Sequence, residues 1–217
     1  MFLNKRYKKQ PRDYYYQGYY NLRSWRRFFY QKKFDYILEK IKQVGARDIL
    51  DLGCGNGIFI KLAQERGLKA FGVDNNWEFL WVARKLVGKE NIKKADIRSI
   101  NLKKTFEIIT CLDVLEHFSM DDLVRVFFQM QLHLKDSGYL FITFPTSLYL
   151  KITEPLWKML RFCIYGKRNF VDRDIHHLLK VENIQEIAQK NHLILKERKT
   201  IVWGLLHWMI LQKNETL

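Results

Sequence analysis

The chain has 217 residues, which is enough for one α/β domain with a full hydrophobic core and short for two. Its 38 Lys and Arg residues against 23 Asp and Glu give a formal net charge of +15. Residues 1–47 hold 13 of these basic residues and 3 of the acidic ones. This balance favours nucleic acid, an anionic membrane surface or an acidic substrate as a partner, although a solvated, lysine-rich surface explains it equally well.

Three other features exclude further classes of protein. The longest apolar run, residues 201–211, is far short of the roughly 20 residues that span a bilayer, which excludes a transmembrane protein. No apolar segment follows the basic N-terminus, so we expect no secretory signal. The three cysteines form no close pair and no metal-ligand spacing. A reducing, cytoplasmic compartment fits this cysteine usage.

Residues 1–20 are basic and tyrosine-rich without a clear period, and apolar spacing predicts a helix over 21–43. We interpret residues 1–43 as a basic, aromatic N-terminal helical cap and residues 44–217 as the main domain. From residue 48 onward, predicted strands and helices alternate. The predicted strands are 48–52, 69–73, 92–95, 106–112 and 138–144, with two more from the apolar runs 193–195 and 201–211. The predicted helices are 58–66, 77–87, 121–134 and 181–190.

Repeated β–α units of this length predict a Rossmann-like, seven-stranded, mostly parallel sheet with helices on both faces. Residues 146–180 are too many for a simple connection, and they contain their own apolar and aromatic stretch. We therefore expect this segment to be a lid or substrate insertion after the fifth strand.

A glycine loop follows the first of these strands. Asp51 ends the strand and is followed by Gly53, Gly55 and Gly57, which let the backbone approach a ligand closely. A dinucleotide fingerprint would need its third glycine at position 58, which is Ile, and no Gly-Lys-Ser/Thr follows as in a P-loop. The spacing therefore indicates a site for a nucleoside without a pyrophosphate.

The segment Asp51-Leu-Gly-Cys-Gly-Asn-Gly resembles the first motif of class I S-adenosylmethionine (SAM) dependent methyltransferases. About twenty residues further on, Asp74 ends a strand where a carboxylate can accept both ribose hydroxyls. The resemblance places Asn75 beside the adenine, Asp96 at its amino group and Ile97 on its ring, and Asp51 beneath the methionine part of SAM. The expected cofactor-binding residues are Asp51, Gly53, Cys54, Gly55, Gly57, Asp74, Asn75, Asp96, Ile97, Leu112 and Asp113.

Residues 113–117, Asp-Val-Leu-Glu-His, resemble a signature of the small-molecule branch of this family, including ubiquinone-pathway O-methyltransferases. In those relatives an acid-x-x-acid-His group holds a divalent cation. The first acid here is Asp rather than Glu, and we expect no metal. A methyl acceptor of high pKa needs a base, and His117, His176 and His177 are the candidates by residue type.

The sequence does not identify the methyl acceptor. Aromatic and basic residues alternate over 14–34, a pattern that suits a cover over the cofactor, an anionic membrane or nucleic acid. We expect methyl transfer to an O or N atom of a small, apolar or lipid-linked acceptor, with peripheral membrane contact. The alternatives are an RNA or protein methyltransferase that uses the basic N-terminal segment, and a non-catalytic protein that binds SAM or another nucleoside.

Overall fold

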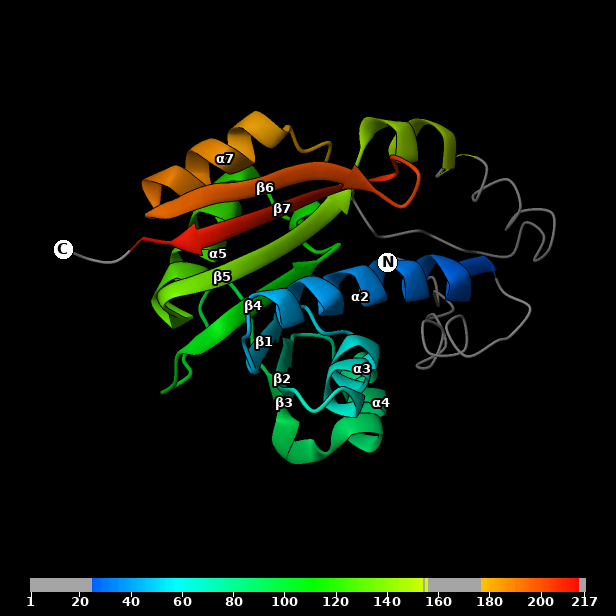
Figure 1. Ribbon diagram of the computed structural model, residues 1–217, viewed down its shortest axis with the longest axis vertical. Helices are drawn as coiled ribbons and strands as arrows, with labels where there is room; N and C mark the ends of the chain where they lie inside the picture. The colour runs from blue at the N-terminus through cyan, green and yellow to red at the C-terminus, as the bar shows by residue number, and fades with distance from the viewer. Residues whose placement is uncertain (1–24, 154, 156–176, 215–217) are drawn as a thin grey trace, which may run out of the picture.

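The computed structural model describes residues 25–153, 155 and 177–214, and it confirms the seven-stranded, mostly parallel sheet (Figure 1). The strand order is β3-β2-β1-β4-β5-β7-β6. Strands β1 to β5 are parallel, and β7 runs antiparallel to its neighbours β5 and β6. The strands are β1 Asp48–Leu52, β2 Lys69–Asp74, β3 Ile92–Lys94, β4 Phe106–Leu112, β5 Leu134–Pro145, β6 Leu193–Ile201 and β7 Leu206–Lys213.

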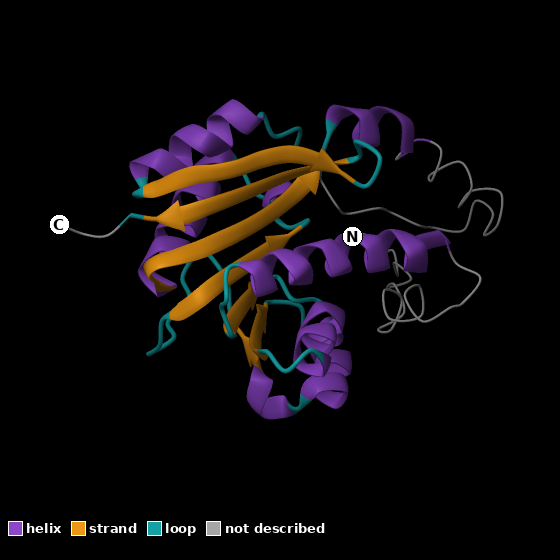
Figure 2. Ribbon diagram, in the orientation of Figure 1, coloured by secondary structure: helices purple, strands orange, loops and turns teal. Residues whose placement is uncertain are grey.

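Helices cover both faces of the sheet (Figure 2). Helices α2 (Trp25–Gln43), α3 (Ile58–Glu65) and α4 (Trp77–Val87) contribute apolar side chains to one buried cluster. Helices α5 (Met120–His133) and α7 (Val181–Lys190) contribute to the cluster on the opposite face. The short helices are η1 (Lys89–Asn91), η2 (Leu115–His117) and the π-helical η3 (Tyr149–Thr153).

Local caps explain why several helix bounds were predictable. The Asn76 side chain accepts a hydrogen bond from the Glu78 N–H at the start of α4, and Gly88 at φ 90° ends this helix. The predicted helix 77–87 is confirmed without change. Ser119 caps α5 by accepting from the Asp122 N–H, so this helix starts at Met120, one residue before its predicted start.

The predicted ends of the last three strands are wrong. Strand β5 begins at Leu134 instead of 138, and β6 extends to Ile201 instead of ending at 195. The run 201–211 is not continuous, because Val202, Trp203 and Gly204 all have positive φ and form a turn before β7. Of the predicted helix 21–43 and lid 146–180, residues 21–24, 154 and 156–176 lie outside the described residues.

Helix α2 packs onto the sheet as part of the core. Phe34, Ile37, Leu38 and Ile41 are all buried in the same cluster as the strand residue Ile49. The predicted boundary between the N-terminal cap (1–43) and the main domain (44–217) stays a prediction, although α2 and the main domain share this core. Among the described residues, no helix combines the length and apolar character needed to cross a bilayer.

Candidate active site

The glycine loop leaves β1 at the carboxyl end of the parallel strands and delivers the chain to α3. The Gly53 and Cys54 N–H groups donate to the Val73 carbonyl oxygen over 2.8 and 3.0 Å, which fixes the loop to β2. Gly57, at φ 75°, is the N-cap of α3. Hydrogen bonds thus attach the first part of the loop to β2, and the last residue of the loop begins α3.

Two of the glycines are needed for different reasons. A Cβ on Gly53 would lie 2.4 Å from Val114 Cγ2, and its φ of 76° already disfavours any other residue. A Cβ on Gly55, at φ 51°, would meet no atom within 4 Å among the described residues. The loop therefore presents an open space at Gly55, as expected of a surface that receives a ligand.

Cys54 points away from that surface. Its side chain is buried, and a Cβ on Gly72 of β2 would lie 2.7 Å from its sulfur. Burial raises the pKa of the Cys54 thiol well above its usual value, so it stays protonated. Among the predicted cofactor residues, Cys54 can therefore contribute its backbone, while its thiol fills the gap beside Gly72.

Asp74 joins the end of β2 to the glycine loop. Its Oδ2 accepts a hydrogen bond from the Gly55 N–H over 2.9 Å, and its Oδ1 accepts from the Asn76 N–H over 2.8 Å. Burial raises the pKa of Asp74, and the hydrogen bonds to its carboxylate oppose that shift. The structure thus brings the predicted ribose-binding carboxylate against the loop, while the neighbouring Asn75 is exposed.

Asp51 lies beneath the loop and is nearly inaccessible, with 3% of its surface exposed. It pairs with Thr110 of β4 in the sheet, and the Thr110 hydroxyl donates to its Oδ1 over 2.7 Å. Burial raises the pKa of Asp51 to about 7, against the opposing effects of this hydrogen bond and of the Lys33 charge. A cation bound nearby would favour the ionised form.

Asp113, directly after β4, is held by two side chains at a left-handed backbone position with φ 57°. Thr143 of β5 donates its hydroxyl to Oδ1 over 2.6 Å, and Lys33 of α2 donates to Oδ2 over 2.6 Å. Leu112, the preceding residue, is half-buried in the core cluster beneath α2. Sequence analysis missed Lys33, whose side chain is 2% exposed, because an isolated lysine on a helix has no local signal of burial.

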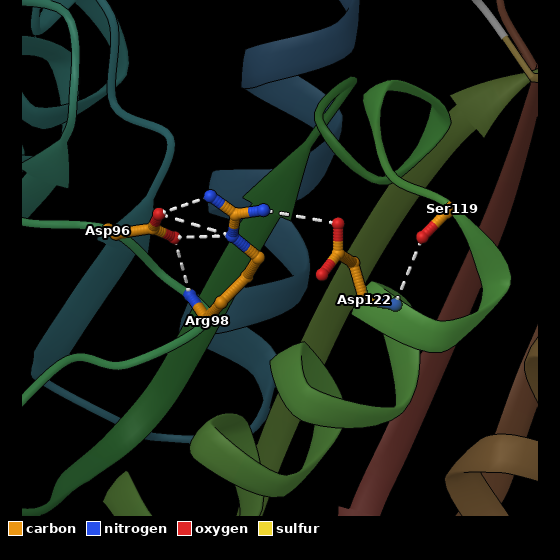
Figure 3. Close-up of polar contacts among 4 residues, drawn as sticks. All are labelled: Asp96, Arg98, Ser119 and Asp122. Atoms are coloured by element: carbon orange, nitrogen blue, oxygen red, sulfur yellow. Dashed lines mark hydrogen bonds and ion pairs between the residues drawn. The ribbon is translucent and has the colours of Figure 1, made fainter.

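Asp96 is engaged by an arginine two residues away (Figure 3). The Arg98 guanidinium donates to both Asp96 oxygens and also reaches Asp122 at the start of α5 over 3.1 Å. Hydrogen bonds from the Arg98 side chain lower the pKa of Asp96. Ile97 is buried in the core cluster with α5, so Asp96 is the more exposed of the two predicted adenine contacts.

Two of the three histidine candidates lie on neighbouring backbone segments. His117 and His177 are both exposed, and the His177 N–H donates to the Glu116 carbonyl oxygen over 2.7 Å, which places this backbone beside η2. His176 lies outside the described residues. Within the ranges that the structure describes, no three His, Cys, Asp or Glu side chains are grouped so that they could hold a metal ion.

Asn56, in the middle of the loop, is a second residue that sequence analysis missed. Its side chain is 4% exposed, and neither its amide nitrogen nor its amide oxygen has a partner among the described residues. A buried, unpaired amide costs about 1–3 kcal/mol. Together with the space at Gly55, it fits a loop that is completed by a polar ligand.

Comparisons with known proteins agree with this geometry. A family profile described as "Methyltransferase domain" matches residues 22–187. The chain belongs to this methyltransferase family. It is 26% identical over 181 residues to the ubiquinone biosynthesis O-methyltransferase of Rickettsia typhi, which covers 80% of this chain and 72% of that enzyme. It is 30% identical over 122 residues to the enzyme of the same name from Actinobacillus pleuropneumoniae, so the match spans about half of each chain, 51% in both cases.

Solved structures show the same fold. A Pyrococcus horikoshii protein aligns with a TM-score of 0.70 at 17% identity over 95% of this chain and 100% of its own. The magnesium protoporphyrin IX methyltransferase of Synechocystis, with bound S-adenosylhomocysteine (SAH), aligns with a TM-score of 0.68 at 15% identity, covering 87% of this chain and 85% of that one. The predicted Rossmann-like fold and the methyltransferase family are confirmed.

Proposed function

We propose that this methyltransferase moves the methyl group of SAM to an O or N atom of a small, apolar or lipid-linked acceptor. The single observation behind this proposal is the contact between the glycine loop and Asp74, through the Gly55 N–H, at the edge where Asp51 and Asp113 also lie. The names of the relatives point to a hydroxyl acceptor of ubiquinone biosynthesis as the substrate class.

The cofactor supplies an activated methyl group on a positively charged sulfonium. Each protein group has a separate part in holding it. Asp74 retains lone pairs for the ribose hydroxyls, since the Gly55 and Asn76 N–H groups use one on each oxygen. We assign Asp96, which accepts hydrogen bonds from Arg98, to the adenine amino group. Asp51 and Asp113 provide negative charge for the cationic methionine end.

At the acceptor end the protein must orient a nucleophile, exclude water and accept a proton. We assign the proton-accepting role to the histidine set His117, His176 and His177. The exposure of His117 and His177 beside η2 leaves their rings accessible to an acceptor that enters from solvent. Replacing each histidine by Ala and measuring the transfer rate tests this assignment, which fails if none of the three changes lowers the rate.

An exposed aromatic tip supports peripheral contact with an anionic membrane. This tip consists of Phe28, Lys32 and Trp203. The two rings are 51% and 64% exposed and stack at a centroid distance of 5.6 Å, and the Lys32 ammonium lies 4.9 Å from the Phe28 centroid. Aromatic rings beside a lysine suit an interface of headgroups and acyl chains. The turn that carries Trp203 adjoins the carboxyl end of β5, because Thr146 donates its N–H to the Leu205 carbonyl oxygen over 3.0 Å and its hydroxyl to the Gly204 carbonyl oxygen over 2.9 Å. We infer a cytoplasmic protein that collects its acceptor from a membrane surface.

The test combines binding and turnover. Calorimetry should detect binding of SAM and SAH, and labelled SAM should transfer its methyl group to a component of a lipid extract that contains hydroxylated ubiquinone precursors. Asp74→Asn should weaken SAM binding by about 10- to 100-fold, the loss expected for one charged hydrogen bond. The matched control is Asp35→Asn, which changes an exposed aspartate that pairs with Arg66. Absence of SAM binding, or equal binding by both variants, would contradict the proposal.

Membrane contact has its own test. Wild-type protein should sediment with anionic vesicles at low salt, and Trp203→Ala should reduce the bound fraction several-fold without changing SAM binding. If wild-type protein stays in the supernatant, the membrane proposal is wrong while the methyl-transfer proposal stands.

A further inference from the structure

Lys33 is a buried lysine whose charge faces the candidate active site. Its side chain is 2% exposed, and its Nζ lies 2.6 Å from Asp113 Oδ2. The same nitrogen lies 4.9 Å from the Phe34 ring centroid and 5.1 Å from that of Tyr30. Lysine is almost never buried without a partner, because removing an ammonium from water is costly. The position is therefore a specific one, built from α2, the end of β4 and two rings.

Asp113 transmits the effect of this ammonium into the site. The Asp113 side chain is 26% exposed against 2% for Lys33, so Asp113 is the more accessible partner of this ion pair. The Thr143 hydroxyl holds the second oxygen, and the Asp113 N–H donates to the Thr143 carbonyl oxygen over 3.0 Å. Each carboxylate oxygen thus accepts one side-chain hydrogen bond. The net charge that a ligand meets at this position depends on whether Lys33 is present beside Asp113.

The site around the loop is otherwise acidic, with Asp51, Asp74 and Asp113 all at this edge. Negative charge binds a sulfonium more tightly than the neutral thioether of SAH. In the transfer, a lone pair of the acceptor bonds to the methyl carbon, the carbon–sulfur electron pair passes to sulfur, and the acceptor releases one proton to a base. The positive charge on sulfur disappears in this step. Carboxylates alone would therefore stabilise the reactant more than the transition state.

We propose that Lys33 is a positioning residue whose ammonium, acting through Asp113, offsets this acidic surround and weakens the binding of SAM relative to SAH. The inference rests on the proposed function, since it concerns the same cofactor site. Lys33 then raises the rate of transfer at the expense of ground-state affinity for the methyl donor. It also fixes α2 against the site.

The experiment compares dissociation constants of SAM and SAH by calorimetry, at a pH well above 7 so that Asp51, whose pKa the Lys33 charge lowers, stays ionised. Lys33→Met should increase the preference for SAM over SAH on the order of tenfold, because it removes one positive charge near the sulfonium site. Lys33→Arg keeps the charge and should leave the preference within about twofold of wild type. The matched control is Lys40→Met, which removes another α2 lysine from an ion pair, with Glu197 at 2.9 Å. This control should not change the preference.

Turnover gives a second readout, in which Lys33→Met should lower both kcat and the KM for SAM. A purely structural role would instead weaken SAM and SAH by the same factor or raise KM, and either result would overturn the proposal. If Lys33→Met does not fold, the double variant Lys33→Met/Asp113→Asn serves instead, because it removes both charges of the ion pair. It should keep the wild-type preference between SAM and SAH. A changed preference in the double variant would overturn the proposal. Wild-type protein that binds neither ligand would overturn the proposed function itself.

Discussion

The buried carboxyl of Asp51 makes the stability of the ligand-free protein depend on pH in a predictable direction. Burial raises its pKa in the folded protein to about 7, from 3.8 for an exposed aspartate. The perturbation is Asp51→Asn, which removes the titration and retains an oxygen that can accept the Thr110 hydrogen bond. The amide is also close in size to the carboxyl group, so the core needs little repacking.

The sign follows from the proton count. Between pH 3.8 and about 7, the folded protein binds the Asp51 proton and the unfolded chain has lost it. The unfolding free energy of the wild type therefore falls as pH rises through this window, and the contribution of Asp51 becomes constant above it. With about 1.4 kcal/mol per pKa unit, the loss between about pH 5 and about pH 8 is roughly 3 kcal/mol. Asp51→Asn does not lose this amount.

Urea unfolding of the two proteins over this pH range measures the difference, because all other titrating groups are shared. The curves of unfolding free energy against pH should diverge by roughly 3 kcal/mol, while Asp35→Asn should run parallel to the wild type. Parallel curves for Asp51→Asn would refute the reasoning that burial controls this carboxyl group. In calorimetry near pH 7, SAM should also release more protons than SAH does, and Asp51→Asn should abolish that difference.

Three further predictions concern the loop and the attachment of α2. Gly55→Ala and Gly45→Ala each place a Cβ in open space at positive φ, and each should lower the unfolding free energy by about 1 kcal/mol in urea. Only Gly55→Ala should weaken SAM binding in calorimetry. Equal SAM affinities of the two variants would show that the loop does not receive the ligand. Gly53→Ala should cost roughly 3 kcal/mol, and adding Val114→Ala should recover part of this, seen as a favourable coupling energy in a double-mutant cycle. Glu197→Gln should destabilise the protein by about 1 kcal/mol, and by less at high salt. Hydrogen bonds from Lys40, Lys199 and Tyr36 outweigh the effect of burial and hold the pKa of Glu197 at about 2. A loss of stability that does not depend on salt would contradict this ionic interpretation.

The parts of the fold that the sequence predicted well have local causes. Helix α4 has a capping asparagine before it and a glycine after it, and five of the seven residues of β4 are apolar. Strand β6 was underestimated because its later residues are Lys, Glu, Arg and Thr, which suit a sheet edge and give no apolar signal. The turn at 202–204 depends on positive φ at a valine and a tryptophan, which propensity does not predict.

The candidate site divides in the same way. The glycine loop and Asp74 were predictable, because each lies at the end of an apolar strand that can be recognised in the sequence. Lys33 and Thr143 reach Asp113 from residues 80 and 30 positions away, so their roles depend on the packing of α2 and β5. The ion pair between Asp96 and Arg98 is local, but no motif distinguishes it from a solvated turn.

The placement of β7 between β5 and β6 has a consequence for biosynthesis. Strand β5 pairs over Tyr139–Pro145 with β7, which comes after β6 in the chain. A polypeptide interrupted before residue 206 would leave this edge of β5 without its partner, and β6 would have no strand through which to join the sheet. Exposed, apolar strand edges pair readily with other chains. Incomplete copies are therefore expected to aggregate or to require chaperones, because the sheet closes only when one of its interior strands arrives last.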